Sequence, residues 1–247
     1  MLKHKIPVFA AGACLLFVAG SVRADDEKTV TLANPLKAGD SVRYKNTSVI
    51  DIGGMEITLE QTQKRTVKDV KESGEITVIV AEEGGKVNFG AGDTEIPPSE
   101  PTTIIQAKSG KISSFKPESE NMYLSVPTRH LMVLGERVVL PDKPVKAGDS
   151  WTTEIDNPAV KGKKVTIKTT YIGPDKVDGA AAWKLKQTME AATEGGKMTA
   201  ETTSLLDASN GQLLSAELVM KAIPANNGPI DLKGKIVRVK AEAKAAK

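Results

Sequence analysis

The chain has 247 residues, of which 34 are basic and 31 acidic, and only 4% are aromatic. The length is sufficient to bury a sizeable hydrophobic core. A nearly balanced charge and few aromatic side chains argue against nucleic-acid or sugar binding, which rely on basic surfaces and stacking platforms.

Residues 1–24 are typical of a secretory signal peptide. Lys3 and Lys5 precede an apolar stretch over residues 6–20, and the small residue Ala24 stands at the expected cleavage site. The apolar stretch is shorter than the roughly 20 residues that span a bilayer. We therefore expect an exported bacterial protein, periplasmic or extracellular, without a transmembrane segment after cleavage.

Removal of residues 1–24 changes the net charge and the cysteine content of the chain. It takes away Lys3, Lys5 and Arg23, which leaves 31 basic and 31 acidic residues and a net charge of zero. Cys14 is the only cysteine, so the mature chain has no thiol or disulfide. A lipoprotein in which Cys14 is lipidated and retained stays open as the alternative to its removal. We expect a monomer that has no nucleic-acid partner.

Alternation of apolar and polar residues predicts β-strands along most of the chain. One polar, solvent-exposed face and one apolar face per strand favour an antiparallel sheet. Glycine-containing turns separate the alternating stretches. We expect about eleven or twelve strands. The stretches begin near Val42, Met55, Ile76, Val165 and Trp183, and the predicted turns include Gly53–Gly54, Gly74, Gly84–Gly85, Gly179, Gly195–Gly196 and Gly211.

A segment near the start of the chain recurs 109 residues later. Pro35–Tyr44 and Pro144–Thr153 both contain Lys-Ala-Gly-Asp-Ser. Such a repeat predicts two related halves, about 30–130 and 140–240, within a single domain over 25–247. Gly-Asp before a strand is typical of a turn. The predicted structural corners of the two halves are Gly39, Asp40, Gly148, Asp149 and Trp151.

The halves are joined by a connector over about 119–141, where the spacing of apolar residues predicts a short helix. Pro127 suits the first turn of a helix that begins after Ser125, and Pro141 would end it. The predicted fold is therefore mostly β, an antiparallel sheet of about 11–12 strands with one short helical connector.

No group of residues indicates catalysis. His130 is the best single candidate because histidine titrates near neutral pH, but the serine motif that a triad needs is absent. Asp40 and Asp149 resemble a carboxylate pair, yet turn chemistry explains them better. No cofactor motif or metal-ligand spacing is present. We expect a protein that is not an enzyme and that has no cofactor and no metal site.

The paired segments resemble a family of uncharacterised secreted bacterial proteins with a Pro-x-Lys-x-Gly-Asp-x-Trp signature. The signature is complete at Pro144–Trp151, and at Pro35–Val42 it has Val42 in place of the tryptophan. The architecture of such proteins is similar to that of periplasmic lipoprotein carriers. This resemblance implies a strongly curved antiparallel sheet, an open barrel or half-barrel whose concave side accepts acyl chains, with the 119–140 connector as a helical lid. It implies no catalytic residues.

Two functions fit these expectations. The first is binding or carriage of a lipid or other apolar ligand on the concave face of the sheet. The second is a structural or interaction module of the bacterial envelope without a small-molecule ligand. For the first, the predicted ligand face comprises Ile167, Tyr171, Trp183 and Leu185.

Overall fold

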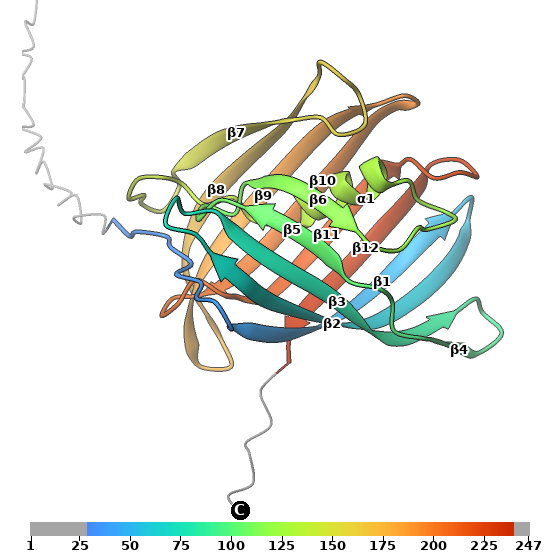
Figure 1. Ribbon diagram of the computed structural model, residues 1–247, viewed down its shortest axis with the longest axis horizontal. Coiled ribbons are helices and arrows are strands. Elements are labelled where there is room, and N and C mark those ends of the chain that lie inside the picture. The colour runs from blue at the N-terminus through green and yellow to red at the C-terminus, as the bar shows by residue number, and fades with distance from the viewer. Residues whose placement is uncertain (1–28, 240–247) are drawn as a thin grey trace, which may run out of the picture.

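The computed structural model describes residues 29–239, so the predicted signal peptide and Cys14 lie outside the described residues. Twelve strands and one helix make up this part of the chain (Figure 1). The helix is α1 (Val126–Glu136), and it separates two sets of strands. The first set is β1 (Ser41–Ile52), β2 (Met55–Val70), β3 (Ile76–Asn88), β4 (Asp93–Ile96), β5 (Thr102–Gln106) and β6 (Ile112–Pro117). The second set is β7 (Ser150–Asp156), β8 (Lys164–Val177), β9 (Ala180–Thr193), β10 (Gly196–Asp207), β11 (Leu213–Ile223) and β12 (Ile230–Arg238).

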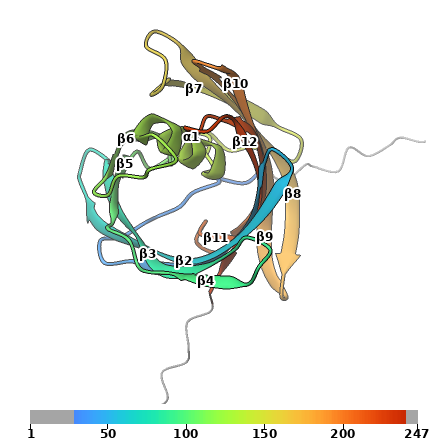
Figure 2. The same cartoon turned by 90° about the vertical axis from the view of Figure 1, so that its right-hand side faces the viewer.

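All the strands belong to one antiparallel sheet with the order β6-β5-β3-β2-β1-β12-β11-β10-β9-β8-β7, and β4 pairs with β3. The two sets meet where β1 pairs with β12. The sheet curls around α1, which connects the edge strands β6 and β7 and lies inside the curve (Figure 2). The predicted fold class, a curved and open antiparallel sheet with one helix, is confirmed.

Helix α1 begins where the sequence predicts. The Ser125 hydroxyl oxygen accepts a 3.3 Å hydrogen bond from the Thr128 amide, and a proline occupies the first turn. These features satisfy or remove amide donors that have no partner at a helix start. The helix ends at Glu136 and not at Pro141, because Arg137 takes an extended conformation (φ −92°, ψ 135°).

The two copies of the repeated segment form the same corner. In the first copy, the Asp40 carboxylate accepts from the Lys37 amide at 2.8 Å, and the Gly39 amide donates to the Val67 carbonyl at 2.8 Å. Gly39 has φ +91°, a conformation that glycine adopts without strain. The second copy makes the matching bonds Lys146 N–Asp149 Oδ2 (3.0 Å) and Gly148 N–Tyr171 O (2.7 Å). Each corner thus attaches a first strand to its neighbour.

The predicted turn at Gly84–Gly85 is wrong, because β3 runs through both residues. The register of β2 against β3 shifts between Gln61 and Gln63, as at a β-bulge. A Cβ atom on Gly85 would lie 2.0 Å from the Glu60 carbonyl oxygen. The glycine pair therefore permits close approach of two strands at a bulge and does not reverse the chain.

Candidate functional site

Two neighbouring cavities lie on the concave face between the end of α1 and the first strands of the sheet. The larger has a volume of about 210 Å³ and the smaller about 130 Å³. Arg65, Glu136 and Arg137 line both, so these three side chains mark the junction. The apolar wall of the larger cavity comes from both sets of strands and from the helix, and includes Leu59, Phe115, Leu124, Met132, Val133 and Leu218.

The polar wall of the larger cavity follows from the alternation in β1 and β2. Side chains two residues apart on a strand share a face, and on this face the residues that line the cavity are Asn46 and Ser48 from β1, followed by Gln61, Gln63 and Arg65 from β2. The inner face of this part of the sheet is therefore a mixture of apolar and hydrogen-bonding groups.

Arg65 lies at the junction and has several partners. It forms an ion pair with the Glu136 carboxylate, and both side chains are mostly buried. Its Nε donates to Gln63 Oε1 at 2.7 Å, and its guanidinium carbon lies 4.6 Å from the centre of the Tyr44 ring. Burial raises the pKa of Tyr44, although Arg65 acts in the opposite direction. The tyrosine is thus a neutral surface for the guanidinium.

Arg137, the second cation at the junction, has a neutral partner. Its Nη1 donates to Gln106 Oε1 at 2.8 Å. Burial, reinforced by the positive charge of Arg65, lowers the pKa of Arg137 to about 9. The guanidinium remains protonated at neutral pH. Because Glu136 is paired with Arg65, the junction holds two cations and one carboxylate.

The position of Arg137 depends on strands β9 and β10. Gln187 Nε2 donates to the Arg137 carbonyl at 3.0 Å, and Thr202 Oγ1 donates to the Gly135 carbonyl at 2.7 Å. These side chains satisfy carbonyls that a helix leaves free at its end. Gly135 also packs against Ala200, since a Cβ atom on Gly135 would lie 2.8 Å from the Ala200 side chain. The helix end is therefore fixed to the second half of the sheet.

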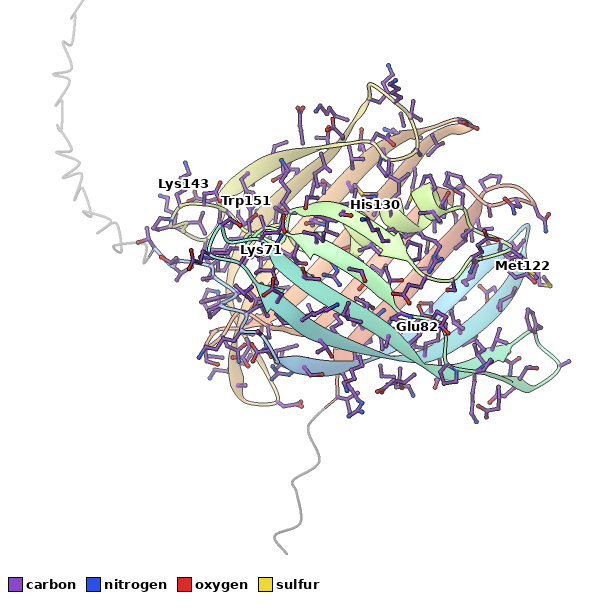
Figure 3. The ribbon with its side chains drawn as sticks, viewed as in Figure 1. Lys71, Glu82, Met122, His130, Lys143 and Trp151 are labelled. Atoms are coloured by element: carbon purple, nitrogen blue, oxygen red, sulfur yellow. The ribbon has the colours of Figure 1, made fainter. Side chains whose placement is uncertain are left out.

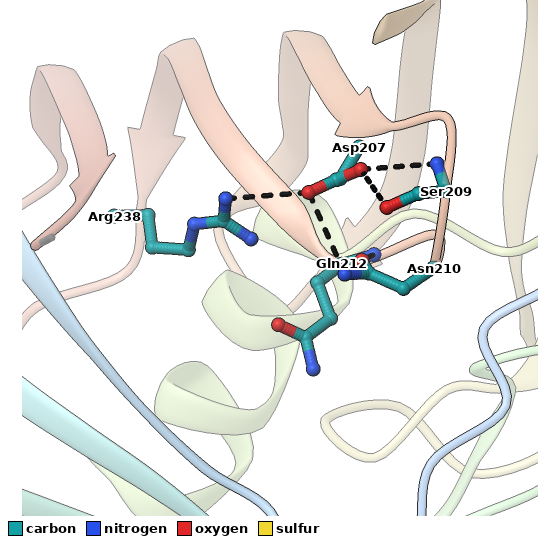
Figure 4. Close-up of polar contacts among 5 residues, drawn as sticks. All are labelled: Asp207, Ser209, Asn210, Gln212 and Arg238. Atoms are coloured by element: carbon teal, nitrogen blue, oxygen red, sulfur yellow. Dashed lines mark hydrogen bonds and ion pairs between the residues drawn. The ribbon is translucent and has the colours of Figure 1, made fainter. Parts of the chain in front are cut away.

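A third arginine near Tyr44, Arg238, has a carboxylate partner, unlike Arg137. Arg238 Nη2 lies 3.3 Å from the Asp207 carboxylate, which also accepts from the Ser209 amide and hydroxyl (Figure 4). Burial raises the pKa of Asp207, but the hydrogen bonds from Ser209 and Arg238 outweigh it and lower the pKa overall. Asp207 is therefore a permanent counter-ion for Arg238.

Two amide side chains that line the cavities have oxygens without a partner. Asn46 Oδ1 in the larger cavity and Asn34 Oδ1 in the smaller one are buried, and neither has a hydrogen-bond partner among residues 29–239. An unsatisfied buried acceptor costs free energy. Each is a position where a ligand or water could supply a donor.

The predicted ligand-face residues lie elsewhere on the concave side. Ile167 and Leu185 are completely buried, Tyr171 nearly so, and Trp183 is half-buried. Tyr171 and Leu185 belong to a small apolar cluster with Leu32, Leu140, Val145 and Leu206, against which Trp183 packs. None of the four lines either cavity. As a ligand face they stay a prediction, whereas the junction arginines were missed, although the polar run at Gln61, Gln63 and Arg65 could have signalled them.

The predicted corner residue Trp151 lies at the end of the sheet that is remote from the start of α1. Trp151 Nε1 donates to the Val139 carbonyl at 2.8 Å, which attaches β7 to the segment after the helix. Figure 3 shows Trp151 and Met122 near opposite ends of the molecule. Asp40 and Asp149 belong to separate corners, and their side-chain hydrogen bonds are those of turns.

His130 lies on α1 (Figure 3). Its ring stacks on that of Phe115 with 5.2 Å between ring centres. Its Nε2 is buried without a hydrogen-bond partner in the described part of the chain. Burial lowers the pKa of His130, which favours the neutral ring. Among the described residues no group of three His, Cys, Asp or Glu side chains could hold a metal ion.

Comparison with known proteins gives distant structural likenesses. No family model matches the sequence, and no curated protein matches it. A protein with a YmcC-like fold from Bacteroides fragilis is 13% identical with a TM-score of 0.37, and the match covers 85% of this chain and 98% of that one. The hypothetical lipoprotein YmcC from Escherichia coli is 12% identical with a TM-score of 0.27, and the match covers 81% and 85%. A domain proposed to belong to outer membrane lipoprotein sorting, from Vibrio parahaemolyticus, is 7% identical with a TM-score of 0.23 over 83% and 87%.

In the described residues, no helix has the length and apolar character needed to cross a bilayer.

Proposed function

We propose that this protein is a non-catalytic, extracytoplasmic protein that binds a lipid or other apolar ligand on its concave face. The observation that carries the proposal is the cavity of about 210 Å³ under α1, walled by apolar side chains from both sets of strands. Ligand pockets combine such walls with a few converging polar groups, and the arginines and amides at the junction supply these groups. The signal-like start of the chain supports an extracytoplasmic location.

The size of the cavity bears on the ligand. Pockets for drug-sized ligands have volumes of about 300–1,000 Å³, which exceeds that of the larger cavity. A single short chain fits more readily than a molecule with several acyl chains, unless α1 moves. The end of α1 is fixed by Gln187 and Thr202, whereas Val126 in its first turn is exposed. A movement of α1 would therefore open the cavity near the start of the helix.

Titration of delipidated protein with a fluorescent fatty-acid probe tests this proposal. We expect saturable binding with one site per chain. Val133→Trp places a bulky ring at the cavity wall and should reduce binding at least tenfold, whereas Val126→Trp, on an exposed position of the same helix, should leave it unchanged. Absence of saturable binding by the correctly folded wild-type protein would overturn the proposal.

A second candidate, an interaction module without a ligand, is favoured by one observation. Exposed apolar side chains lie at strand ends and in loops: Ile52 and Met55 flank the turn between β1 and β2, Phe89 follows β3, and Met122 and Tyr123 precede α1. Asn226, between β11 and β12, holds one of these regions in place: its side-chain amide donates to the Met122 carbonyl at 2.6 Å, and its backbone amide donates to the Tyr123 carbonyl at 3.1 Å. Native mass spectrometry of protein purified from its own envelope separates the candidates: a copurifying lipid supports the carrier, and a ligand-free chain that also fails to bind the probe supports the module.

A further inference from the structure

The charges around the two cavities do not balance. Three arginines (Arg65, Arg129 and Arg137) and two glutamates (Glu82 and Glu136) line the larger cavity. In the smaller cavity, Arg65, Lys108 and Arg137 face Asp40 and Glu136. Each cavity therefore has one more cation than anions, and both sets include the guanidinium of Arg137.

Contacts within the protein leave the charge of Arg137 only partly compensated, because the Glu136 carboxylate favours the charged form of Arg137 but is bonded to Arg65. The amide partner of Arg137, Gln106, carries no charge. The negative end of the α1 dipole favours a cation here, but Gln187 and Thr202 already bond its last carbonyls. A guanidinium has five N–H donors, and a mostly enclosed cation without an anion is costly. Arg238, paired with Asp207, has no such deficit.

We propose that the ligand is a single-chain amphiphile whose anionic head, a carboxylate or a phosphate, binds Arg137 and Arg65 at the junction while its chain fills the larger cavity. This inference rests on the proposed function, since it specifies the ligand of the same cavity. The head would give Arg137 the charge-assisted hydrogen bonds that it lacks. The chain would lie against Phe115, Met132, Val133 and Leu218.

The arrangement of the cavities suits such a molecule. The arginines stand at one boundary of the larger cavity, where it meets the smaller one, and Leu124 from the segment before α1 lines the larger cavity too. A head at the junction therefore directs the chain toward the beginning of the helix. The unpartnered Asn46 oxygen in the same cavity is available to a hydroxyl group on the ligand.

The experiment compares four twelve-carbon competitors against the fluorescent probe at pH 8: dodecanoate, dodecyl phosphate, dodecanol and dodecyltrimethylammonium. An apolar cavity alone would favour dodecanol, because the uncharged chain is the most hydrophobic of the four. We expect the anions to bind about tenfold or more tightly than dodecanol, which is the size expected for charge-assisted hydrogen bonds. Binding of dodecanoate but not dodecyl phosphate, or the reverse, identifies the head group.

Variants test whether the arginines are responsible. Arg137→Gln should remove the preference for anions over dodecanol, and Arg65→Gln should reduce this preference. Arg43→Gln, the same change on an exposed arginine of β1 that pairs with Glu83, is the control and should have no effect. The preference is measured first on the unaltered protein, so it does not depend on whether a variant folds.

The outcomes separate the two proposals. Equal or tighter binding of dodecanol or of the cationic amphiphile would overturn the anionic head and leave the proposed function standing. Binding of none of the four, by folded protein, would overturn both. An anion preference that survives in folded Arg137→Gln and Arg65→Gln proteins would overturn the assignment to these arginines.

Discussion

The two halves of the sheet have the same corner but different inner faces. The corner bonds make Val67 equivalent to Tyr171, so Arg65, two residues earlier on β2, stands where β8 has Thr169. Thr169 is completely buried, and its hydroxyl donates to Gln187 at 3.3 Å within the protein. Arg65 instead lines two cavities. A shared corner thus determines how a strand pair begins, whereas the inward residues determine whether the face is filled or open.

The position of α1 follows from this difference. Its buried residues Leu131, Leu134 and Gly135 lie on the side that contacts β9, β10 and β11. The short side chains of Ala200 and Ala216 on those strands allow close approach. Over β1 and β2 the larger polar side chains keep the helix away, which leaves the cavities. The inner face of β9 and β10 therefore packs on α1, whereas the inner face of β1 and β2 lines the cavities.

The largest effect should distinguish the fully packed part of the concave face from the part that lines the cavities. Leu185→Ala removes a completely buried side chain, and we expect the free energy of unfolding to fall by about 2–5 kcal/mol. Leu59→Ala, at the wall of the larger cavity, should cost about 1 kcal/mol because fewer contacts are lost. Urea denaturation of both variants measures the difference. Equal losses would contradict the division of the concave face.

The next effect concerns the contact that fixes the end of α1. Gly135→Ala forces a methyl group against Ala200, and we expect a loss of about 1–3 kcal/mol in unfolding free energy, as for other overpacked sites. Gly195→Ala is the matched control, because open space surrounds its Cβ position and its φ is not in the left-handed region. Thermal unfolding of the two variants should differ clearly. A stable Gly135→Ala protein would show that α1 is not held tightly on β10.

A smaller effect tests the equivalence of the two corners. Asp40→Ala and Asp149→Ala each remove one carboxylate that accepts from the amide three residues earlier. We expect both to lower the free energy of unfolding by the same amount, about 0.5–1.5 kcal/mol. Parallel chemical denaturation checks this. A cost confined to one corner would indicate that the repeated segments differ in structural importance.

The sequence predicted the fold well because alternation and turn residues act locally. The strands with regular alternation and the start of α1 after Ser125 follow from such local patterns, whereas the open curvature of the sheet was expected only from the family resemblance. The Gly84–Gly85 turn was wrong, because a bulge and a turn both require glycine, and only the pairing with β2 distinguishes them.

The candidate site was less predictable, since it depends on contacts between distant parts of the chain. Arg65 and Arg137 are 72 positions apart in the numbering and meet only when α1 lies inside the sheet. Their significance also depends on which one Glu136 pairs with, and no sequence pattern specifies that choice. The predicted apolar residues Ile167 and Leu185 show the converse, because alternation identifies an inward face without revealing what already covers it.

The smallest predicted effect is the pH dependence that His130 brings to the helix. Burial lowers its pKa in the folded protein, whereas the unfolded chain titrates near 6.5. Below pH 6.5 the unfolded state therefore binds more protons than the folded state, so stability falls as the pH falls and levels off once the folded ring is also protonated.

His130→Phe keeps a ring that can stack on Phe115 but cannot titrate. We expect the free energy of unfolding of the wild-type protein to decrease on acidification just below pH 6.5, and that of the variant to remain level there. Carboxylates with lowered pKa values, such as Asp207, act at more acidic pH and leave this window clear. A wild-type stability that is constant through the window, or a decrease that persists in the variant, would contradict a buried neutral His130 between α1 and the first half of the sheet.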